Sequence, residues 1–254
     1  MNELSLFTGA GGGVLGSKLL GHRIIGYVEK DDYCQRMLAQ RIRDGVIDNA
    51  PIYSDIKTFI DSGRCELYRG ITDIVSAGFP CQDFSIANLQ RQNGNGEKNL
   101  WSQTAACLRL IRPRVALLEN VPNLYRTTYG RRISGDLAEM FLHIRGIALS
   151  YAYIGGNIVR KRIWVLAFTS SIGWDEIEVF CKSIKQRTEK THRERELFGI
   201  IPCGDTRGRL WAFRDTDLER SFDGMADWVD SIKSIGNGQV PAVVKLAFQT
   251  LTGA

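Results

Sequence analysis

Histidine is scarce in this chain. Its three histidines are His22, His143 and His192. None lies beside a plausible metal partner in the sequence, so we interpret all three as surface or packing residues. A mechanism that rests on a histidine base is therefore disfavoured. We also expect no metal site.

Paired cysteines are missing as well. No Cys-x-x-Cys pair occurs, which argues against a zinc site or a dithiol redox centre. A disulfide framework is not expected in a chain of 254 residues without a visible export signal. A reducing cytoplasm fits this usage best. The six scattered cysteines are Cys34, Cys65, Cys81, Cys107, Cys181 and Cys203.

Long hydrophobic runs are absent too. No segment approaches membrane-spanning length, and the start Met1-Asn2-Glu3-Leu4 lacks a basic leader, so we expect neither a membrane span nor a secretion signal. What is present is typical of a globular chain: 44% hydrophobic and 24% charged residues. The net charge of +5 is compatible with a polyanionic partner but does not require one. One substantial α/β domain with a small appendage is expected.

A glycine-rich turn follows the first predicted strand. Residues 3–7 predict a strand, which runs into Thr8-Gly9-Ala10-Gly11-Gly12-Gly13 and then a helix ending at Leu20. A strand, a glycine-rich turn and a helix make the first unit of a nucleotide-type fold. The turn is not a clean G-x-G-x-x-G, and no Gly-Lys-Ser/Thr follows it. By itself it indicates no specific ligand.

Acidic residues follow the next two predicted strands. The strand at 24–28 ends in Glu29, about twenty residues past the glycine turn, which is the spacing of a ribose-binding acid. The alternative is a solvated charge at a strand end. A third strand at 51–56 carries Asp55, which could equally cap a helix over 56–61. Both roles can coexist, and a helix at 32–43 separates the two strands.

A cysteine stands just past the fourth predicted strand, at 71–77. That strand closes on Gly78-Phe79-Pro80-Cys81-Gln82-Asp83-Phe84-Ser85. The carboxyl ends of strands in open α/β sheets are where ligands collect. The polar residues at 90–99 indicate a mobile flap beside the thiol. From these residues alone, Cys81 is equally a nucleophile or an inert buried thiol.

A carboxylate and a basic cluster mark the next strands. Glu119 stands at the tip of a predicted strand at 114–118, which makes it a candidate acid or base. Arg160-Lys161-Arg162 opens a predicted strand at 163–168, and these residues could also solubilise a sheet edge. The remaining predicted elements in this half are a helix at 100–111, a helix at 134–145 and a strand at 147–154.

The alternation of predicted strands and helices stops between about 169 and 224. Lys, Arg and Thr are frequent at 182–195, and isolated aromatic residues occur around them. This texture indicates a small irregular subdomain. Its charge run is either a solvated helix face or a nucleic-acid surface. A turn at 235–241 then leads into a predicted helix at 242–251.

Taken in order, these motifs resemble the DNA cytosine-C5 methyltransferases. The match covers the whole chain except the region around 170–224. Four features depart from the family pattern: Ser5 stands in place of the usual Asp, Lys30 in place of an aromatic residue, Ile158 in place of Gln, and the penultimate motif, expected at 209–229, is hardly recognisable. The matching motifs are Leu6-Phe7-Thr8-Gly9-Ala10-Gly11-Gly12, Glu29, Asp55-Ile56, Gly78-Phe79-Pro80-Cys81-Gln82, Glu119-Asn120-Val121, Arg160-Lys161-Arg162, and Gly236-Asn237 with Val240-Pro241.

The resemblance implies a Rossmann-like AdoMet-dependent methyltransferase fold, α/β in class, with a mostly parallel seven-stranded sheet. Residues 1–169 and 235–254 would form the AdoMet-binding catalytic domain. Residues 170–234 would form a small irregular target-recognition subdomain. We expect the protein to act as a cytoplasmic monomer on double-stranded DNA, without a metal.

The resemblance also implies roles for individual residues. Cys81 would attack a flipped-out cytosine, assisted by Glu119, Arg160 and Arg162. S-adenosyl-L-methionine would be bound by Phe7, Thr8, Gly9, Gly11, Gly12, Glu29, Lys30, Asp55, Ile56, Pro80, Leu100, Asn237 and Val240. DNA would be contacted by Ser85, Arg91, Lys182, Lys185, Arg187, Arg193 and Arg195.

Three other interpretations stay open at this point. The nearest is an RNA cytosine-C5 methyltransferase of the same fold. A DNA-binding module that has lost turnover is motivated by Lys30 and Ile158. A nicotinamide dehydrogenase would account for the glycine turn but leaves the motifs around Cys81 and Glu119 unexplained.

Overall fold

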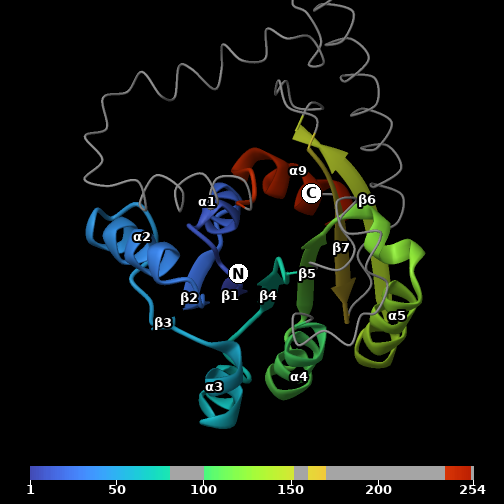
Figure 1. Cartoon of the computed structure of the whole chain (residues 1–254), viewed down its shortest axis with the longest axis horizontal. Helices are drawn as coiled ribbons and strands as arrows, with labels where there is room; N and C mark the ends of the chain where they lie inside the picture. The colour runs from blue at the N-terminus through green and yellow to red at the C-terminus, as the bar shows by residue number, and fades with distance from the viewer. Residues whose placement is uncertain (81–99, 152–159, 170–237, 253–254) are drawn as a thin grey trace, which may run out of the picture.

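A seven-stranded sheet organises the chain. The computed structural model describes residues 1–80, 100–151, 160–169 and 238–252. The strand order is β3-β2-β1-β4-β5-β7-β6 (Figure 1). Neighbours from β3 to β5 run parallel, whereas β7 is antiparallel to both β5 and β6. The predicted mostly parallel sheet is thus confirmed. The strands are β1 (Asn2–Leu6), β2 (Arg23–Val28), β3 (Ile52–Tyr53), β4 (Ile74–Ala77), β5 (Val115–Asn120), β6 (His143–Ser150) and β7 (Lys161–Phe168).

Helices cover both faces of the sheet (Figure 1). One face carries α1 (Gly12–Leu19), α2 (Asp32–Arg43) and α9 (Pro241–Thr252), and the other carries α3 (Ile56–Asp61), α4 (Trp101–Ile111) and α5 (Thr128–Met140). Because successive side chains of a strand point to opposite faces, Leu117 packs in the α9 layer and Leu118 in the α4 layer. Burial on both faces explains why these strands read as continuous apolar runs.

Helix starts follow their caps closely. The predicted helix at 32–43 is confirmed as α2, where the Asp31 side chain accepts a hydrogen bond of 3.1 Å from the Cys34 N–H. The alternative role of Asp55 as a cap is confirmed too. Its carboxylate accepts from the N–H groups of Lys57 and Thr58 at the start of α3, at 2.7 and 3.2 Å.

Three predicted elements had wrong boundaries. The helix predicted at 134–145 is α5, Thr128–Met140, because the Thr127 hydroxyl caps it early by accepting from the Gly130 N–H at 3.1 Å. Phe141 is extended, and β6 begins at His143 rather than at 147. The third strand is only Ile52–Tyr53, since the residues after it turn to cap α3.

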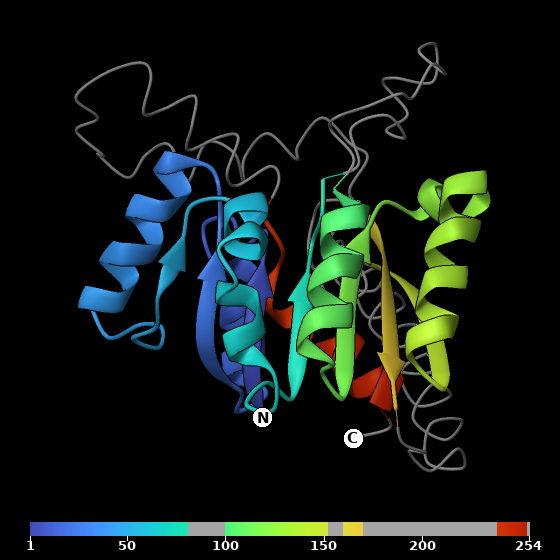
Figure 2. The ribbon, with the colours of Figure 1, turned by 90° about the horizontal axis from the view of Figure 1, so that it is seen from below.

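The two ends of the antiparallel strand β7 lie at opposite edges of the sheet. Its first residues pair with the end of β5, Asn120 opposite Ile163, while Phe168 pairs with Val115 at the start of β5. Figure 2 shows the β7 arrow pointing opposite to those of β1 and β2. Two short 3-10 helices complete the described structure, η1 (Arg64–Tyr68) and η4 (Pro122–Arg126).

Some sequence predictions concern residues outside the described ranges, among them the flap at 84–99 and the target-recognition region at 170–234. Within the described ranges, no helix is long and apolar enough to cross a bilayer. The cysteines described there, Cys34, Cys65 and Cys107, are buried.

A buried carboxylate fixes the start of the sheet. Glu3 on β1 is 1% exposed. It accepts hydrogen bonds from the hydroxyls of Ser17 on α1 at 2.8 Å and Ser76 on β4 at 2.5 Å. The ring of His22 lies 2.8 Å away through Nδ1. Three segments of the chain are therefore joined through one side chain.

We predict that Glu3→Ala lowers the free energy of unfolding by about 3 kcal/mol, because three buried partners lose their acceptor. Urea denaturation measures this. The exposed Glu66 offers a matched control, and Glu66→Ala should stay within about 0.5 kcal/mol of the parent. A loss below about 1 kcal/mol in Glu3→Ala would contradict the assigned network.

Candidate functional site

The candidate site lies where the carboxyl ends of β1, β2, β4 and β5 meet the beginning of β7. Parallel strands bring their carboxyl ends to one edge of the sheet, where ligands bind in α/β folds. Glu119 pairs with Trp164 in the antiparallel register, so the arginines that open β7 reach the same edge. Glu119 lies within β5, which continues to Asn120, two residues farther than the sequence predicted.

Glu119 is paired with an arginine at this edge. Arg162 Nε lies 3.0 Å from Glu119 Oε1, and the two side chains are 27% and 12% exposed. Burial raises the pKa of Glu119 above its ordinary value, and the charges of Arg162 and then Arg160 oppose that rise. The net direction is upward, so this carboxyl holds a proton at higher pH than a free glutamate does.

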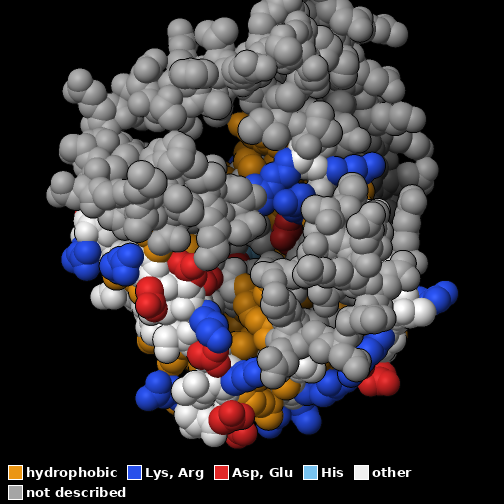
Figure 3. Space-filling view, in the orientation of Figure 1, with side chains coloured by type: hydrophobic (Ala, Val, Ile, Leu, Met, Phe, Trp, Pro, Cys, Tyr) orange, Lys and Arg blue, Asp and Glu red, His pale blue; other side chains and the backbone are white. Residues whose placement is uncertain are grey.

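The second arginine, Arg160, interacts with the same charged groups. Burial and the neighbouring charge of Arg162 lower the pKa of Arg160, while Glu119 acts in the opposite direction. Two guanidiniums thus face one carboxyl, which favours ligands that carry anionic or carbonyl oxygens. Figure 3 shows basic side chains directly beside an acidic one in the hollowed middle of this face. The predicted grouping of Glu119, Arg160 and Arg162 is present in the structure.

Residues 78–80 lead from β4 into Cys81, and we call them the base of the cysteine loop. This base is fixed against β5. Asn120 Nδ2 donates to the Phe79 carbonyl at 3.0 Å, and Asn120 Oδ1 accepts from the Val121 N–H at 2.8 Å. The ring of Phe79 packs on Trp101 with 5.5 Å between centroids. Pro80 is the last described residue before Cys81. The predicted site residues that lie outside the described ranges are Cys81, Ser85, Arg91, Lys182, Lys185, Arg187, Arg193, Arg195 and Asn237.

The glycine turn has an unusual backbone. Phe7, Gly9 and Gly11 have φ values of 54°, 58° and 92°, which lie in the left-handed region. Phe7 bears a steric cost there that glycine avoids. The Thr8 hydroxyl donates to the Ser5 carbonyl at 3.1 Å and so holds the turn against the end of β1. The residues from Phe7 to Gly12, which were predicted to contact the ligand, therefore lie in one tight bend.

Glu29 is part of this bend rather than a solvated charge. It is 9% exposed, so the interpretation as a solvated strand end was wrong. Its two carboxylate oxygens accept the N–H groups of Gly9 at 2.6 Å and Asp31 at 2.8 Å. A carboxylate has about four acceptor positions. Glu29 can hold the turn and still accept a hydroxyl from a ligand.

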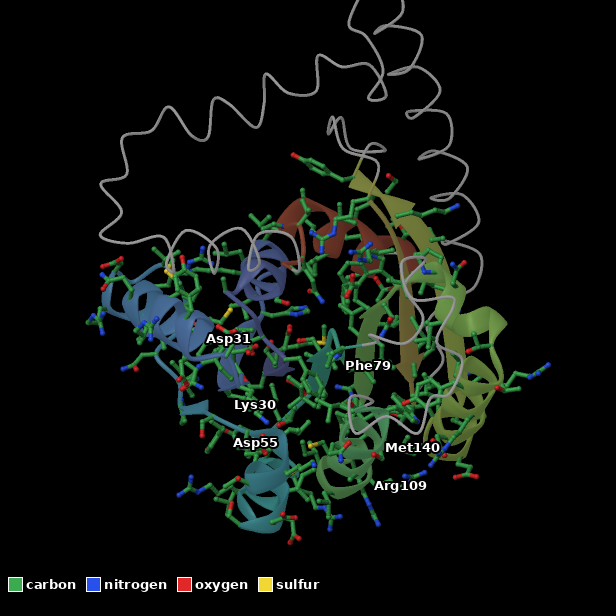
Figure 4. The ribbon with its side chains drawn as sticks, viewed as in Figure 1. Lys30, Asp31, Asp55, Phe79, Arg109 and Met140 are labelled. Atoms are coloured by element: carbon green, nitrogen blue, oxygen red, sulfur yellow. The ribbon has the colours of Figure 1, made fainter. Side chains whose placement is uncertain are left out.

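Lys30 and Asp55 point toward each other from neighbouring segments (Figure 4). Their charged atoms are 3.5 Å apart, and the lysine side chain is 82% exposed. Burial acts to raise the pKa of Asp55, but hydrogen bonds from the Thr58 and Lys57 N–H groups and the charge of Lys30 hold it below its ordinary value. Asp55 is therefore an ionised acceptor at neutral pH.

The other residues predicted to bind the cofactor differ in which of their atoms a ligand could contact. Ile56 is 4% exposed and belongs to the core, so a ligand would meet its backbone. Val240 packs against the core layer of α9. Leu100 precedes α4, and its carbonyl accepts from the Thr104 N–H at 3.0 Å. Within the described ranges, no group of three or more His, Cys, Asp or Glu side chains could hold a metal ion.

The model of the family "C-5 cytosine-specific DNA methylase" matches residues 1–243. The chain belongs to this family. Among curated relatives, the type II methyltransferase M.PspPI of a Psychrobacter species is 33% identical over 132 residues, covering 52% of this chain and 30% of the relative. M.HhaI of Haemophilus parahaemolyticus is 25% identical over 252 residues, covering 87% and 74%.

Similarity to solved structures supports the fold. A variant of Spodoptera frugiperda DNMT2 superposes with a TM-score of 0.53 at 18% identity, over 68% of this chain and 51% of that one. At that identity the likeness shows a shared fold. The present chain covers only part of the relatives that it matches: 30% of the length of M.PspPI and 29% of the length of M.Eco47II from Escherichia coli.

Sequence reasoning did not assign a site role to two residues of this family member. Asn120 carries no charge, and only its position in Glu119-Asn120-Val121 hinted that it holds the cysteine loop. Gln239 lies in the turn before α9, yet its side chain reaches both Gly13 and Gly78. It also hydrogen-bonds Glu119. An amide that joins segments so distant in sequence has no local pattern to reveal it.

We predict that Arg162→Met raises the pKa of Glu119, because Arg162 is the strongest of the influences that oppose the effect of burial. Arg160→Met should raise it less. The pH titration of the Glu119 side-chain carboxyl, followed by 13C NMR and assigned with Glu119→Gln, measures both. A larger rise in Arg160→Met than in Arg162→Met would contradict the geometry.

Proposed function

We propose that this chain is a DNA (cytosine-5-)-methyltransferase. It would transfer a methyl group from S-adenosyl-L-methionine to C5 of a cytosine flipped out of duplex DNA, through a covalent adduct with Cys81. The observation that carries the proposal is the buried Glu119 carboxyl, held 3.0 Å from Arg162 beside the fixed base of the loop that leads into Cys81. Family membership supports the same chemistry.

The residues at the glycine turn fit S-adenosyl-L-methionine. A Cβ atom on Gly9 would meet no atom of the described residues within 4 Å, which leaves space beside the turn in that part of the structure. The rim carries two carboxylates, Glu29 and Asp55, which suit ribose hydroxyls, an amino group and a sulfonium cation. When bound there, the group would supply an electrophilic methyl.

The same geometry argues against a nicotinamide dinucleotide. The carbonyl oxygen of Gln239 lies against Gly12, the first residue of α1, where a Cβ atom would overlap it. Dinucleotide enzymes place a pyrophosphate at this end of the helix. Here a protein carbonyl, which would repel a phosphate, occupies the neighbourhood of the helix start.

Cys81 would supply covalent catalysis. Cytosine C5 is a poor nucleophile until a thiolate adds at C6, after which the electrons of the 5,6 double bond become available at C5. The sulfur–C6 bond forms in that step. Once C5 carries the methyl group, its proton leaves to water as the candidate base, the double bond re-forms and the sulfur–C6 bond breaks. The guanidiniums of Arg160 and Arg162 would favour the thiolate form of the cysteine.

Glu119 would hold cytosine N3 while charge builds up in the ring. This role requires a carboxyl that is protonated near neutrality, which the upward pKa shift favours. The forked guanidiniums of Arg160 and Arg162 would bind the cytosine O2 and a nearby phosphate. The intact pairing of Glu119 with Arg162 supports turnover rather than a module that has lost it.

DNA recognition would come from the segments around this edge. Flipping a base out of a duplex costs a few kcal/mol, and the flap at 84–99, with Ser85 and Arg91, would close over the vacated position. Residues 170–234 would form the target-recognition region beside a catalytic domain of 1–169 and 235–254. We further propose a monomer that acts in the cytoplasm.

The decisive experiment uses duplex DNA carrying 5-fluorocytosine in random contexts, together with S-adenosyl-L-methionine. We expect a denaturation-resistant adduct with the wild-type chain, because fluorine cannot leave C5 as a proton does. Cys81→Ala should abolish the adduct, and Cys203→Ala should leave it intact. Mass spectrometry of the trapped peptide identifies the attached residue.

The outcomes of that experiment separate the alternatives. DNA binding without an adduct on any sequence would refute the enzyme and favour the DNA-binding module. An adduct with tRNA but not with duplex DNA would establish the RNA methyltransferase. Sequencing of trapped duplexes would report the target site.

A second prediction concerns salt. Replacement of the basic side chains of the recognition region by Gln should weaken DNA binding and flatten the plot of log K against log salt by roughly 0.9 for each phosphate that the variant no longer neutralises. Arg23→Gln is the control, because this exposed arginine begins β2 at the opposite edge of the sheet. An unchanged slope would refute the role of these residues, which are Lys182, Lys185, Arg187, Arg193 and Arg195.

A further inference from the structure

Gln239 lies where three parts of the site meet. A Cβ atom on Gly12 would overlap the backbone carbonyl oxygen of Gln239, and one on Gly13 would overlap its side-chain Oε1. A Cβ atom on Gly78 would come within 2.7 Å of its Nε2. Glycine at these positions leaves room for this one residue, so Gln239 packs against both the glycine turn and the start of the cysteine loop.

The amide nitrogen of Gln239 faces the catalytic carboxyl. The same Cβ position on Gly78 lies 3.3 Å from Glu119 Oε2, so the two side chains flank one point. A hydrogen bond joins them. The other carboxyl oxygen, Oε1, is taken by Arg162 at 3.0 Å. Glu119 therefore has one partner on β7, at Oε1, and a second partner, Gln239, in the turn before α9.

The backbone of Gln239 is itself fixed. Directly after it, α9 packs closely on α1: a Cβ atom on Gly16 would lie 2.5 Å from Val244 Cβ and 2.7 Å from the Pro241 carbonyl oxygen. Val243 and Val244 are buried in the same layer. The segment has little freedom to shift, so the position of the amide is set by the packing of two helices.

We propose that Gln239 is a positioning residue that orients the Glu119 carboxyl toward the target base and joins it to the glycine turn of the methyl-donor site. The inference rests on the proposed function. A primary amide suits this place because its Nε2 donates to a carboxylate while its Oε1 faces the turn. Methionine has nearly the same length without either polar atom, and asparagine keeps the amide but has a shorter reach.

The test compares Gln239→Met with Gln249→Met, the same substitution near the far end of α9. We expect Gln239→Met to lower kcat by roughly tenfold, since a misplaced carboxyl loses much of its contribution to catalysis. The alkaline limb of the pH–rate profile should move to higher pH, because a donor that stabilises the carboxylate is removed. KM for S-adenosyl-L-methionine should rise several-fold, because the glycine turn is held less firmly in its binding geometry.

A readout that does not need turnover accompanies the kinetics. The 13C titration of the Glu119 carboxyl should shift to higher pH in Gln239→Met and stay in place in Gln249→Met. If the wild-type chain forms no adduct, the proposed function fails, yet this titration still decides whether Gln239 controls Glu119. A thermal melt confirms that each variant is folded. If Gln239→Met is not, Gln239→Asn replaces it, with the same directions of change expected.

Two results would overturn the proposal. One is a Gln239→Met variant whose titration and pH–rate profile match those of the wild type. The other is an equal loss in Gln249→Met, which would mean that any change on α9 disturbs the site.

Discussion

One buried carboxyl sets the requirements for the rest of this site. Taking a carboxylate out of water costs several kcal/mol unless charges and hydrogen bonds compensate. Glu119 meets part of that requirement with Arg162, 3.0 Å from its Oε1, and with a hydrogen bond from Gln239. The compensation is incomplete, and the pKa of the carboxyl remains raised. A carboxylate whose burial cost was fully offset by its partners would stay ionised. It could not share a proton with a target cytosine. The proposed role of Glu119 would depend on this balance between burial and pairing.

The polar residues at the strand ends hold the backbone and face the site at the same time. Glu29 accepts two backbone N–H groups, Asp55 caps α3, and Asn120 holds the Phe79 carbonyl. Structural and functional interpretations of such residues are therefore not alternatives. A carboxylate or amide whose position is fixed by backbone hydrogen bonds presents its remaining lone pairs in a defined direction, which is what preorganised binding requires.

Much of the fold could be predicted from the sequence because its signals are local. Asp31 and the periodic residues after it define α2 without reference to the rest of the chain, and the apolar runs of the parallel strands are equally clear. The predicted α5 extended too far along the chain, because apolar residues at helical spacing continue past its end, where Phe141 is already extended. In the site, motifs predicted that Glu119 and the arginines would meet. The contacts of Gln239 depend on how α9 packs against α1, which no stretch of sequence encodes alone.

The reversed direction of β7 decides at which edge of the sheet the chain leaves it. Thr169, just after β7, donates its N–H to the Arg114 carbonyl at the edge where β5 begins. Gly238 stands beside Gln239, at the opposite edge. An eight-residue strand such as β7 spans roughly 26 Å. The chain therefore leaves the sheet at the edge remote from Glu119, and Gly238 and Gln239 lie at the edge that carries it. An insertion or deletion near residue 170 would therefore enter the sheet far from Glu119, so this junction could accept a change in the proposed recognition region without moving the candidate site.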